Sequence, residues 1–257
     1  MQEIAIENMF LKSFKRVKCF KGLFTHDISN LFHVLGNSIE LCEILIKQGI
    51  KTEEVLKYFK MIAEQINRGK KLVRNIIKLS ELEDHETFIE PTDLLEHLEN
   101  AARFINIIFP DREINIKLLS KFENTLVFAN ELLLDVFENI FMNAVDYNKN
   151  EVVHIEVSVS ELWERNKHFL KIEIKDNAIG IKDKRKKEIL QEKHEKSKNS
   201  KGMGLGLSLV AKLIDLYGGH MWIEDRIKRD HNKGSNFILL IPKAIIIGMD
   251  HGTYQEI

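Results

Sequence analysis

Two histidines near the amino terminus could supply a nucleophile. The stretch "FTHDISNLFHVL" holds His26 and His33 seven residues apart, and Asp27 directly follows the first of them. Imidazole attacks through one ring nitrogen, and a carboxylate beside it can orient the ring or take its proton, which gives a nucleophile near neutral pH. Asp27 therefore favours His26 over His33. Taken alone, a His-Asp pair on a helix is more often a surface histidine with no role.

Two asparagines further along the chain could bind one ligand. In "LLLDVFENIFMNAVDYNKN", Asn139 and Asn143 are four residues apart, so a helix places them on one face. Asparagine is unfavourable inside a helix, so an inward-facing pair indicates a ligand for both amides. The alternative is that the two side chains cap or bridge neighbouring loops.

A carboxylate and several glycines could complete a nucleotide site. In "IEIKDNAIGIKD" a strand runs into Asp176, which could accept a hydrogen bond from an exocyclic amine such as that of adenine, and Gly180 lets a ligand approach the backbone. In "KGMGLGLSLVAKL", Gly202, Gly204 and Gly206 open a helix whose free N–H groups suit phosphates. A lysine-rich segment rather than a strand precedes these glycines, which argues against a dinucleotide-binding fold.

The histidines belong to a predicted helical hairpin. A helical pattern covers about residues 14–84 and is interrupted once, where Gly49 can end one helix and Thr52 can cap the next. His26 and His33 lie on the outer face of the first arm. Apolar residues recur at steps of three and four on both arms if Ser38 is counted in the first series and Gly69 is taken as a gap in the second. The residues are Phe24, Ile28, Leu31, Leu35, Cys42 and Leu45 on the first arm and Val55, Phe59, Ile62, Ile66, Val73 and Ile76 on the second. Because a hairpin cannot bury both rows alone, we expect two copies to pair as a four-helix bundle; packing on the rest of the same chain is the alternative.

The remainder of the chain predicts an α/β sandwich. Strand-like runs occur at "EINIKLL", "TLVFA", "VVHIEVSVSEL", "FLKIEIKD", "MWIED" and "NFILLIP", and helical segments at about 93–108, 131–147 and 205–217. We expect mostly antiparallel strands packed against helices, with the domain boundary near Pro91. The lysine-rich stretch 182–201 is expected to be a solvated, flexible loop; screening and positioning of phosphate by its lysines is the alternative.

Composition excludes several classes of protein. Lys plus Arg number 38 against 39 Asp plus Glu, so bulk charge gives no reason to expect nucleic-acid binding. The two cysteines, Cys19 and Cys42, are too few for a disulfide framework and fit a reducing cytoplasm. A helix that crosses a membrane needs an apolar run of roughly 18 residues. We expect neither such a run nor a signal peptide within this chain. A sensor located upstream or in a separate protein remains open.

As a set, and in this order, these motifs resemble those of sensor histidine kinases. The segments around Asn143, Asp176 and Gly204 are similar to the N, G1 and G2 boxes of the ATP-binding domain that these kinases share with gyrase-type ATPases and ninety-kilodalton heat-shock chaperones. "THDISN" resembles the phosphoacceptor H box, and the likeness covers about residues 15–243. The resemblance implies an α+β chain: a dimerisation hairpin over 1–86 with a lead-in at 1–14, an ATP-binding domain of this GHKL type over 87–243, and an extension over 244–257.

The resemblance also implies a role for each motif residue. Asp176 would bind the adenine amino group, which approaches closely at Gly180, and Asn143 with Asn139 would hold Mg²⁺ against the phosphates of ATP. His26 would accept the phosphoryl group with Asp27 beside it, and Asn30 would position water when phosphate is removed from the partner. Gly202, Gly204 and Gly206 would form the hinge of a lid over the phosphates, and Leu205 would belong to the nucleotide-binding residues.

The function implied is that of a cytoplasmic, homodimeric, ATP-dependent protein histidine kinase of a two-component system. Mg-ATP would phosphorylate His26, and the phosphoryl group would pass to an aspartate of a response-regulator receiver domain. ATPases of the superfamily carry a water-activating glutamate where this chain has Asn139, which favours a kinase. Ala178 replaces a glycine usual in the G1 box, and the lid lacks a phenylalanine motif; these departures make a phosphatase-biased or pseudokinase member, acting as a signalling scaffold, the alternative.

Overall fold

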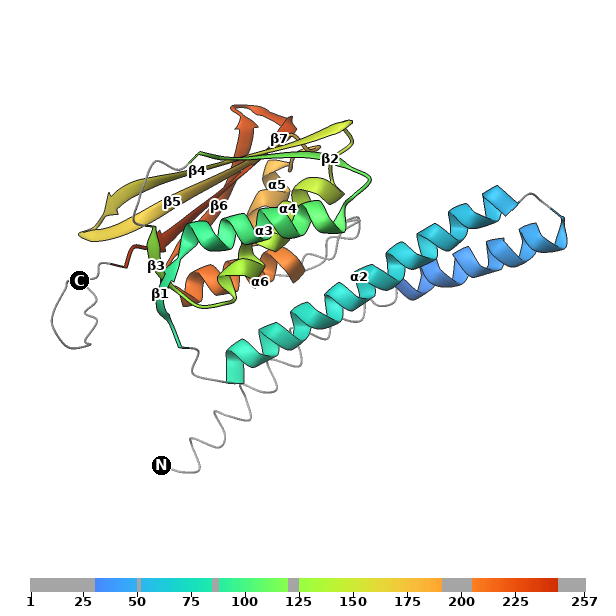
Figure 1. Cartoon of the computed structure of the whole chain (residues 1–257), viewed down its shortest axis with the longest axis horizontal. Helices are drawn as coiled ribbons and strands as arrows, with labels where there is room; N and C mark the ends of the chain where they lie inside the picture. The colour runs from blue at the N-terminus through green and yellow to red at the C-terminus, as the bar shows by residue number, and fades with distance from the viewer. Residues whose placement is uncertain (1–30, 50–51, 85–87, 120–124, 191–204, 245–257) are drawn as a thin grey trace, which may run out of the picture. The chain divides into compact units, whose positions relative to one another are not determined.

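The structure, a computed structural model, describes residues 31–49, 52–84, 88–119, 125–190 and 205–244. The chain divides into two compact units, and along the sequence the first gives way to the second between Glu83 and Asp84 (Figure 1). We call them the helical unit and the sheet unit. None of the helices in the described ranges is both long and apolar enough to cross a membrane.

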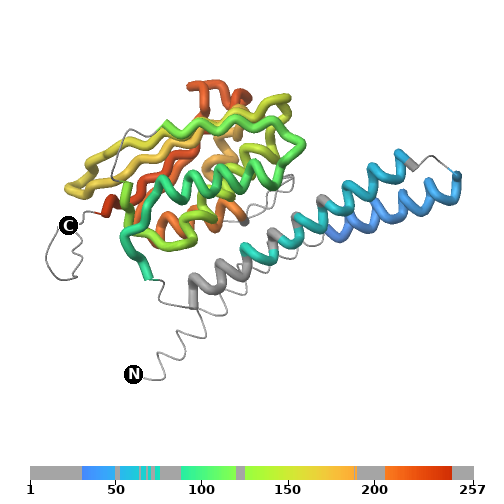
Figure 2. Tube along the Cα trace, in the orientation of Figure 1, coloured from blue at the N-terminus to red at the C-terminus, as the bar shows by residue number. Residues whose placement is uncertain are grey.

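The helical unit is a hairpin of two antiparallel arms (Figure 2). Residues 31–47 are helical, and α2 spans Thr52–Asp84 with Glu53 and Glu54 in its first turn. Gly49 has a φ of +68° at the end of the first arm, a conformation that glycine adopts without strain. Over residues 31–49 and 52–84, the predicted hairpin and its interruption at Gly49 are confirmed; the predicted start of the first arm lies outside the described residues.

The apolar rows of the hairpin serve two different faces. Ser38, Cys42 and Val55 are buried. A Cβ on Gly69 would lie 3.1 Å from Leu31 Cδ1, so the missing side chain lets the arms approach. Three further members of the second row, spaced seven residues apart, remain exposed in one copy of the chain: Phe59 at 53%, Ile66 at 45% and Val73 at 49%. The hairpin thus leaves an apolar stripe on α2 that it does not cover itself.

The sheet unit contains a five-stranded sheet in the order β2-β4-β5-β7-β6. Its strands are β2 (Glu113–Leu119), β4 (Val152–Glu164), β5 (Lys167–Asp176), β6 (His220–Ile227) and β7 (Asp230–Pro242). All neighbours are antiparallel except β2 and β4. The prediction of a mostly antiparallel sheet is confirmed. More buried and more exposed residues alternate along most of β2, β4 and β5, whereas β7 contains a continuous buried run.

A two-stranded sheet was only half predicted. β1 (Glu90–Asp93) pairs antiparallel with β3 (Leu126–Ala129). The domain boundary was predicted near Pro91, and in the structure Pro91 lies inside β1. Proline has no N–H to donate and is tolerated in a short strand with one partner.

Helices cover one face of the five-stranded sheet (Figure 1). They are α3 (Leu94–Ile108), α4 (Leu133–Asp146) and α6 (Leu205–Leu216), close to the ranges predicted. Leu98 and Ile105 of α3, Phe137 of α4 and Leu209 of α6 are fully buried, as is Ile172 of β5. This layer holds α4 and the start of α6 close together.

One prediction about the lysine-rich stretch was wrong. Residues Asp183–Leu190 form the helix α5 rather than a loop. The helix has few apolar residues, and part of its stability comes from Lys186, which is buried between two carboxylates. A charged sequence was mistaken for a solvated one because the partners of Lys186 are not visible in the sequence.

Candidate nucleotide site

The two predicted asparagines lie one turn apart on α4. Asn139 is 3% exposed, and its Nδ2 donates to the carbonyl of Asp135 at 2.8 Å. Its Oδ1 is buried and is without a hydrogen-bond partner among the described residues. An unpaired buried oxygen is costly in an empty site, so its presence indicates a ligand that completes it.

The start of α6 packs directly on this asparagine. α6 begins at Leu205, and a Cβ on Gly206 would lie 2.7 Å from Asn139 Oδ1. Glycine is needed here because any side chain would displace the oxygen. Gly202 and Gly204 lie outside the described residues, and only the backbone of Leu205 is described, so the predicted phosphate-binding loop stays a prediction.

Asp176 is a buried carboxylate at the end of β5. It is 3% exposed, and its Oδ1 accepts the N–H groups of Ala178 at 2.8 Å and Ser235 at 3.2 Å. Burial raises the pKa of Asp176 to about 6, and the two N–H donors and the charge of Arg226 oppose this only in part. Neither donor occupies Oδ2, which is the oxygen a ligand amine would use.

Ala178 fits the turn without strain. Within the described ranges the non-glycine residues with positive φ are Arg165, Asn166 and Arg229, so Ala178 does not need glycine's conformational freedom. Its methyl group is buried, and its N–H holds Asp176. Alanine is therefore compatible with the conformation of this turn, in which a glycine is usual in the G1 box.

The structure gives a reason for the glycine at position 180 that was not predicted from the sequence. Its φ is +70°, and a Cβ there would lie 1.6 Å from the carbonyl oxygen of His231. Gly234 similarly approaches Asp176, where a Cβ would lie 1.9 Å from the backbone oxygen. In the structure Gly180 makes room for β7, and the closeness of a ligand to Gly180 stays a prediction.

A hydrogen-bond network around Asn177, which was not predicted from the sequence, connects this turn to the end of α4. Asn177 Oδ1 accepts from Asn148 Nδ2 at 2.6 Å and from the His154 N–H at 2.8 Å. Asn177 Nδ2 donates to the carbonyl of Val152 at 3.0 Å. The sequence did offer a signal for this network: Asn148 and Asn150 follow shortly after Asn143, and Asn177 follows directly after Asp176. The network holds the β5 turn beside the α4 helix that carries Asn143.

The structure brings only part of the predicted site together. Asn139, Asn143, Asp176, Gly180 and Gly206 belong to three neighbouring segments of the sheet unit. The predicted residues His26, Asp27 and Asn30 lie outside the described residues. His33 is described, and it is exposed on the first arm of the helical unit.

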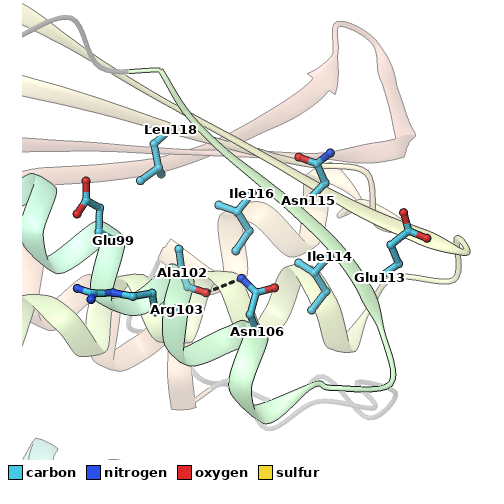
Figure 3. A pocket seen from close by; sticks show the side chains of 9 residues that line it. All are labelled: Glu99, Ala102, Arg103, Asn106, Glu113, Ile114, Asn115, Ile116 and Leu118. Atoms are coloured by element: carbon cyan, nitrogen blue, oxygen red, sulfur yellow. Dashed lines mark hydrogen bonds between the residues drawn. The ribbon is translucent and has the colours of Figure 1, made fainter.

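A separate groove in the sheet unit includes none of these residues. It lies between α3 and β2 and is lined by Glu99, Arg103, Asn106, Ile114, Ile116 and Leu118, among others (Figure 3). Asn106 Nδ2 donates to the carbonyl of Ala102 in its own helix at 3.0 Å, so this amide is already engaged. We do not assign the groove to the nucleotide site.

Comparison with known proteins agrees with the motif order. Residues 129–245 match the family model described as histidine kinase-, DNA gyrase B- and HSP90-like ATPase. The sensor histidine kinase HprS of Escherichia coli K12 is 23% identical over 222 residues, which is 83% of this chain and 46% of that protein. The kinase ArlS of Staphylococcus aureus USA300 is 24% identical over 241 residues, covering 89% of this chain and 49% of that protein. The chain thus spans less than half the length of these two relatives.

Solved structures show the same fold. The crystal structure of histidine kinase ThkA in complex with response regulator protein TrrA matches with a TM-score of 0.66 and 19% identity, over 95% of this chain and 66% of that one. The catalytic domain of ThkA matches with a TM-score of 0.51 and 23% identity, over 61% of this chain and 99% of that one.

Proposed function

We propose that the chain is an ATP-dependent protein histidine kinase, because residues 129–245 match the family model described as histidine kinase-, DNA gyrase B- and HSP90-like ATPase. The chain as a whole also resembles the sensor histidine kinases. A ring nitrogen of His26 attacks the γ-phosphorus of ATP, the bond to the β,γ-bridging oxygen breaks, and ADP leaves. Asp27 orients the ring and takes its proton. An aspartate carboxylate of a response-regulator receiver domain then accepts the phosphoryl group, in the cytoplasm.

The buried carboxylate of Asp176 is the observation that carries this proposal. Its Oδ1 is held by two backbone N–H groups, so the side chain is oriented before a ligand arrives. Oδ2 accepts the exocyclic amine of adenine, which guanine replaces with a carbonyl oxygen. The low exposure of Asp176 strengthens that hydrogen bond and makes it selective for the base.

The asparagines of α4 suit the magnesium ion that accompanies ATP. Amide oxygens are hard ligands of the kind Mg²⁺ takes together with phosphate oxygens and water. The buried, unpaired Oδ1 of Asn139 fits this requirement. When bound, Mg²⁺ would neutralise charge on the phosphates of ATP, and Asn143 and Asn139 would hold it.

The same asparagine argues for phosphoryl transfer to protein rather than to water. An amide cannot take a proton from water, and Asn139 Nδ2 is already committed to the carbonyl of Asp135. The γ-phosphoryl group therefore survives until a better nucleophile reaches it. This supports a kinase over an ATPase.

The exposed stripe on α2 leads us to propose that the kinase is a homodimer. Phe59, Ile66 and Val73 would pack against the same residues of a second hairpin, with a two-fold axis between them. The partner envisaged for the assembled hairpins is a receiver domain, since ThkA was solved in complex with a response regulator.

Replacing Ile66 with glutamate should convert the dimer into a monomer. A buried charge without a partner costs several kcal/mol, and the two-fold axis brings two such charges into one interface. Light scattering after gel filtration should report half the mass of the wild type. Lys60→Glu, an exposed change on α2, should leave the dimer intact; a wild-type monomer would contradict the proposal.

The kinase proposal is tested with γ-labelled ATP and Mg²⁺. The chain should acquire label that is lost in acid and kept in base, as expected for a phosphorylated histidine. Asn143→Ala should lower the rate at least about a hundredfold, because it removes a ligand of the ion that orients the phosphates. Asn106→Ala, on the exposed side of α3, is the matched control and should label normally. Equal rates in the two variants would contradict the assigned role of Asn143.

A further inference from the structure

Lys186 of α5 is a buried cation held by two carboxylates. The residue is 8% exposed, and its Nζ lies 2.9 Å from Asp183 Oδ1 and in still closer contact with Asp225 Oδ1 of β6. Burial alone would lower the pKa of Lys186, but its hydrogen bonds to Asp225 and Asp183 outweigh burial and raise it. The lysine is therefore charged at neutral pH, and we call these three residues the Lys186 cluster.

The two aspartates of the cluster are not equivalent. The side chain of Asp183 is 85% exposed and contributes a solvated partner from the same helix, whereas that of Asp225 is 15% exposed and belongs to another element. An ion pair shielded from water is stronger and more directional than one at the surface. The contact between Lys186 and Asp225 thus fixes α5 on the edge strand β6.

A short series of contacts leads from this ion pair to the nucleotide site. Asp225 stands opposite Ser235 in the register of β6 and β7. The N–H of Ser235 donates to Asp176 Oδ1 at 3.2 Å. The turn between Asp176 and α5 is therefore held at both ends by the same pair of strands, at one end through Ser235 and at the other through Lys186.

We propose that Lys186 and Asp225 are positioning residues for Asp176, which set the orientation of its carboxylate and hence selectivity for a nucleotide base with an exocyclic amine. The inference rests on the proposed nucleotide site. Without the ion pair, α5 is free to shift on β6, and the turn that starts at Asp176 shifts with it. The Ser235 N–H then meets the carboxylate at a changed angle, and Oδ2 no longer points steadily at the amine.

The test compares two ligands in five versions of the chain. The ligands are ADP and purine riboside diphosphate, which lacks the exocyclic amine, and binding is measured by calorimetry. The proteins are the wild type, Lys186→Met, Asp225→Asn, the double variant, and Lys184→Met as the control, since Lys184 is an exposed lysine of the same helix. The melting temperature of each nucleotide-free protein is recorded as well.

Each single variant should weaken ADP binding about tenfold, while binding of the amine-free analogue changes less than about twofold. The double variant should bind ADP no more weakly than the singles, because both changes break one contact. The double variant also removes both buried charges, so it should fold even if a single variant does not. In that case the ADP and analogue affinities of the double variant decide the test. Lys184→Met should match the wild type with both ligands.

Three results would overturn the inference. Unchanged ADP binding in a variant that melts at a lower temperature would make the ion pair purely structural. Equal weakening with both ligands would place its effect on the phosphates instead of Asp176. Weakening in the double variant equal to the product of the two singles would show two independent effects. Failure of the wild type to bind ADP would instead refute the proposed function.

Discussion

Replacing Asp176 with asparagine will weaken ADP binding about a hundredfold at pH 7.5, the size expected when a buried, charge-assisted hydrogen bond is lost. The asparagine oxygen can still accept the N–H groups of Ala178 and Ser235, so the turn should keep its shape. What changes is the second acceptor, since the amide presents an N–H₂ group where Oδ2 stood. Calorimetric titration with ADP checks this result.

The same change will stabilise the nucleotide-free protein. The pKa of Asp176 is raised from 3.8 to about 6 by burial, so the folded state binds a proton more tightly than the unfolded state does. Its contribution to stability is fully favourable below about pH 4, declines as pH rises through about 6, and is unfavourable above that. Two pKa units correspond to about 3 kcal/mol, an upper bound for the gain at pH 7.5.

Urea unfolding at pH 7.5 and at pH 4 measures this difference. Asp176→Asn should exceed the wild type in free energy of unfolding at pH 7.5 and should lose that advantage at pH 4. Asp215→Asn, which changes an exposed carboxylate of α6, should alter neither stability nor ADP binding. An asparagine variant that is less stable at pH 7.5 would show that Asp176 is not held in a site that penalises its charge.

Replacing Gly180 with alanine will destabilise the sheet unit by about 3 kcal/mol or more, among the larger effects of single substitutions. The Cβ would lie 1.6 Å from the carbonyl oxygen of His231, so the backbone of β7 or the turn must move. The φ of +70° adds strain, because side chains are disfavoured in the left-handed region. ADP binding should be lost as well, since the turn carries Asp176.

A second glycine separates the effect of the close contact with His231 from that of backbone strain. Gly218 has the same φ of +70°, but the nearest atom to its Cβ would be Pro242 Cγ at 3.8 Å, which is an ordinary contact. Gly218→Ala should therefore cost only about 1 kcal/mol, the backbone strain alone. Equal losses in chemical denaturation for the two alanine variants would mean that the close approach at Gly180 contributes nothing.

The elements with a regular apolar pattern were predictable from the sequence. β2 matches the run "EINIKLL" residue for residue, and α4 and α6 lie within two residues of the predicted ranges. In these segments the spacing of apolar residues follows from burial of one face. That information is contained in the sequence itself.

The features that depend on distant partners were not predictable. α5 looked like a solvated loop because nothing in its sequence indicates that Asp225 meets Lys186. Gly180 was assigned to the ligand because its neighbour across the turn, His231, lies some fifty residues later in the chain. Asn177 was passed over because its hydrogen bonds to Asn148 and His154 appear only when the strands are paired.

The exposed apolar stripe on α2 was predictable only in part. The sequence showed an apolar row and suggested a partner, but it could not say which members of that row face the other arm. In the structure Val55 is buried while Phe59 and Ile66 are exposed, so one row supplies two faces.

The most direct test of the kinase proposal identifies the residue that accepts the phosphoryl group. The chain is incubated with γ-labelled ATP and Mg²⁺ beside His26→Gln and His33→Gln, after both variants are shown to bind ADP as the wild type does. We predict that His26→Gln loses all acid-labile label and that His33→Gln, which changes an exposed histidine without an adjacent carboxylate, keeps it. Label that persists in His26→Gln, or its absence from a wild type that binds ADP, would contradict the proposal.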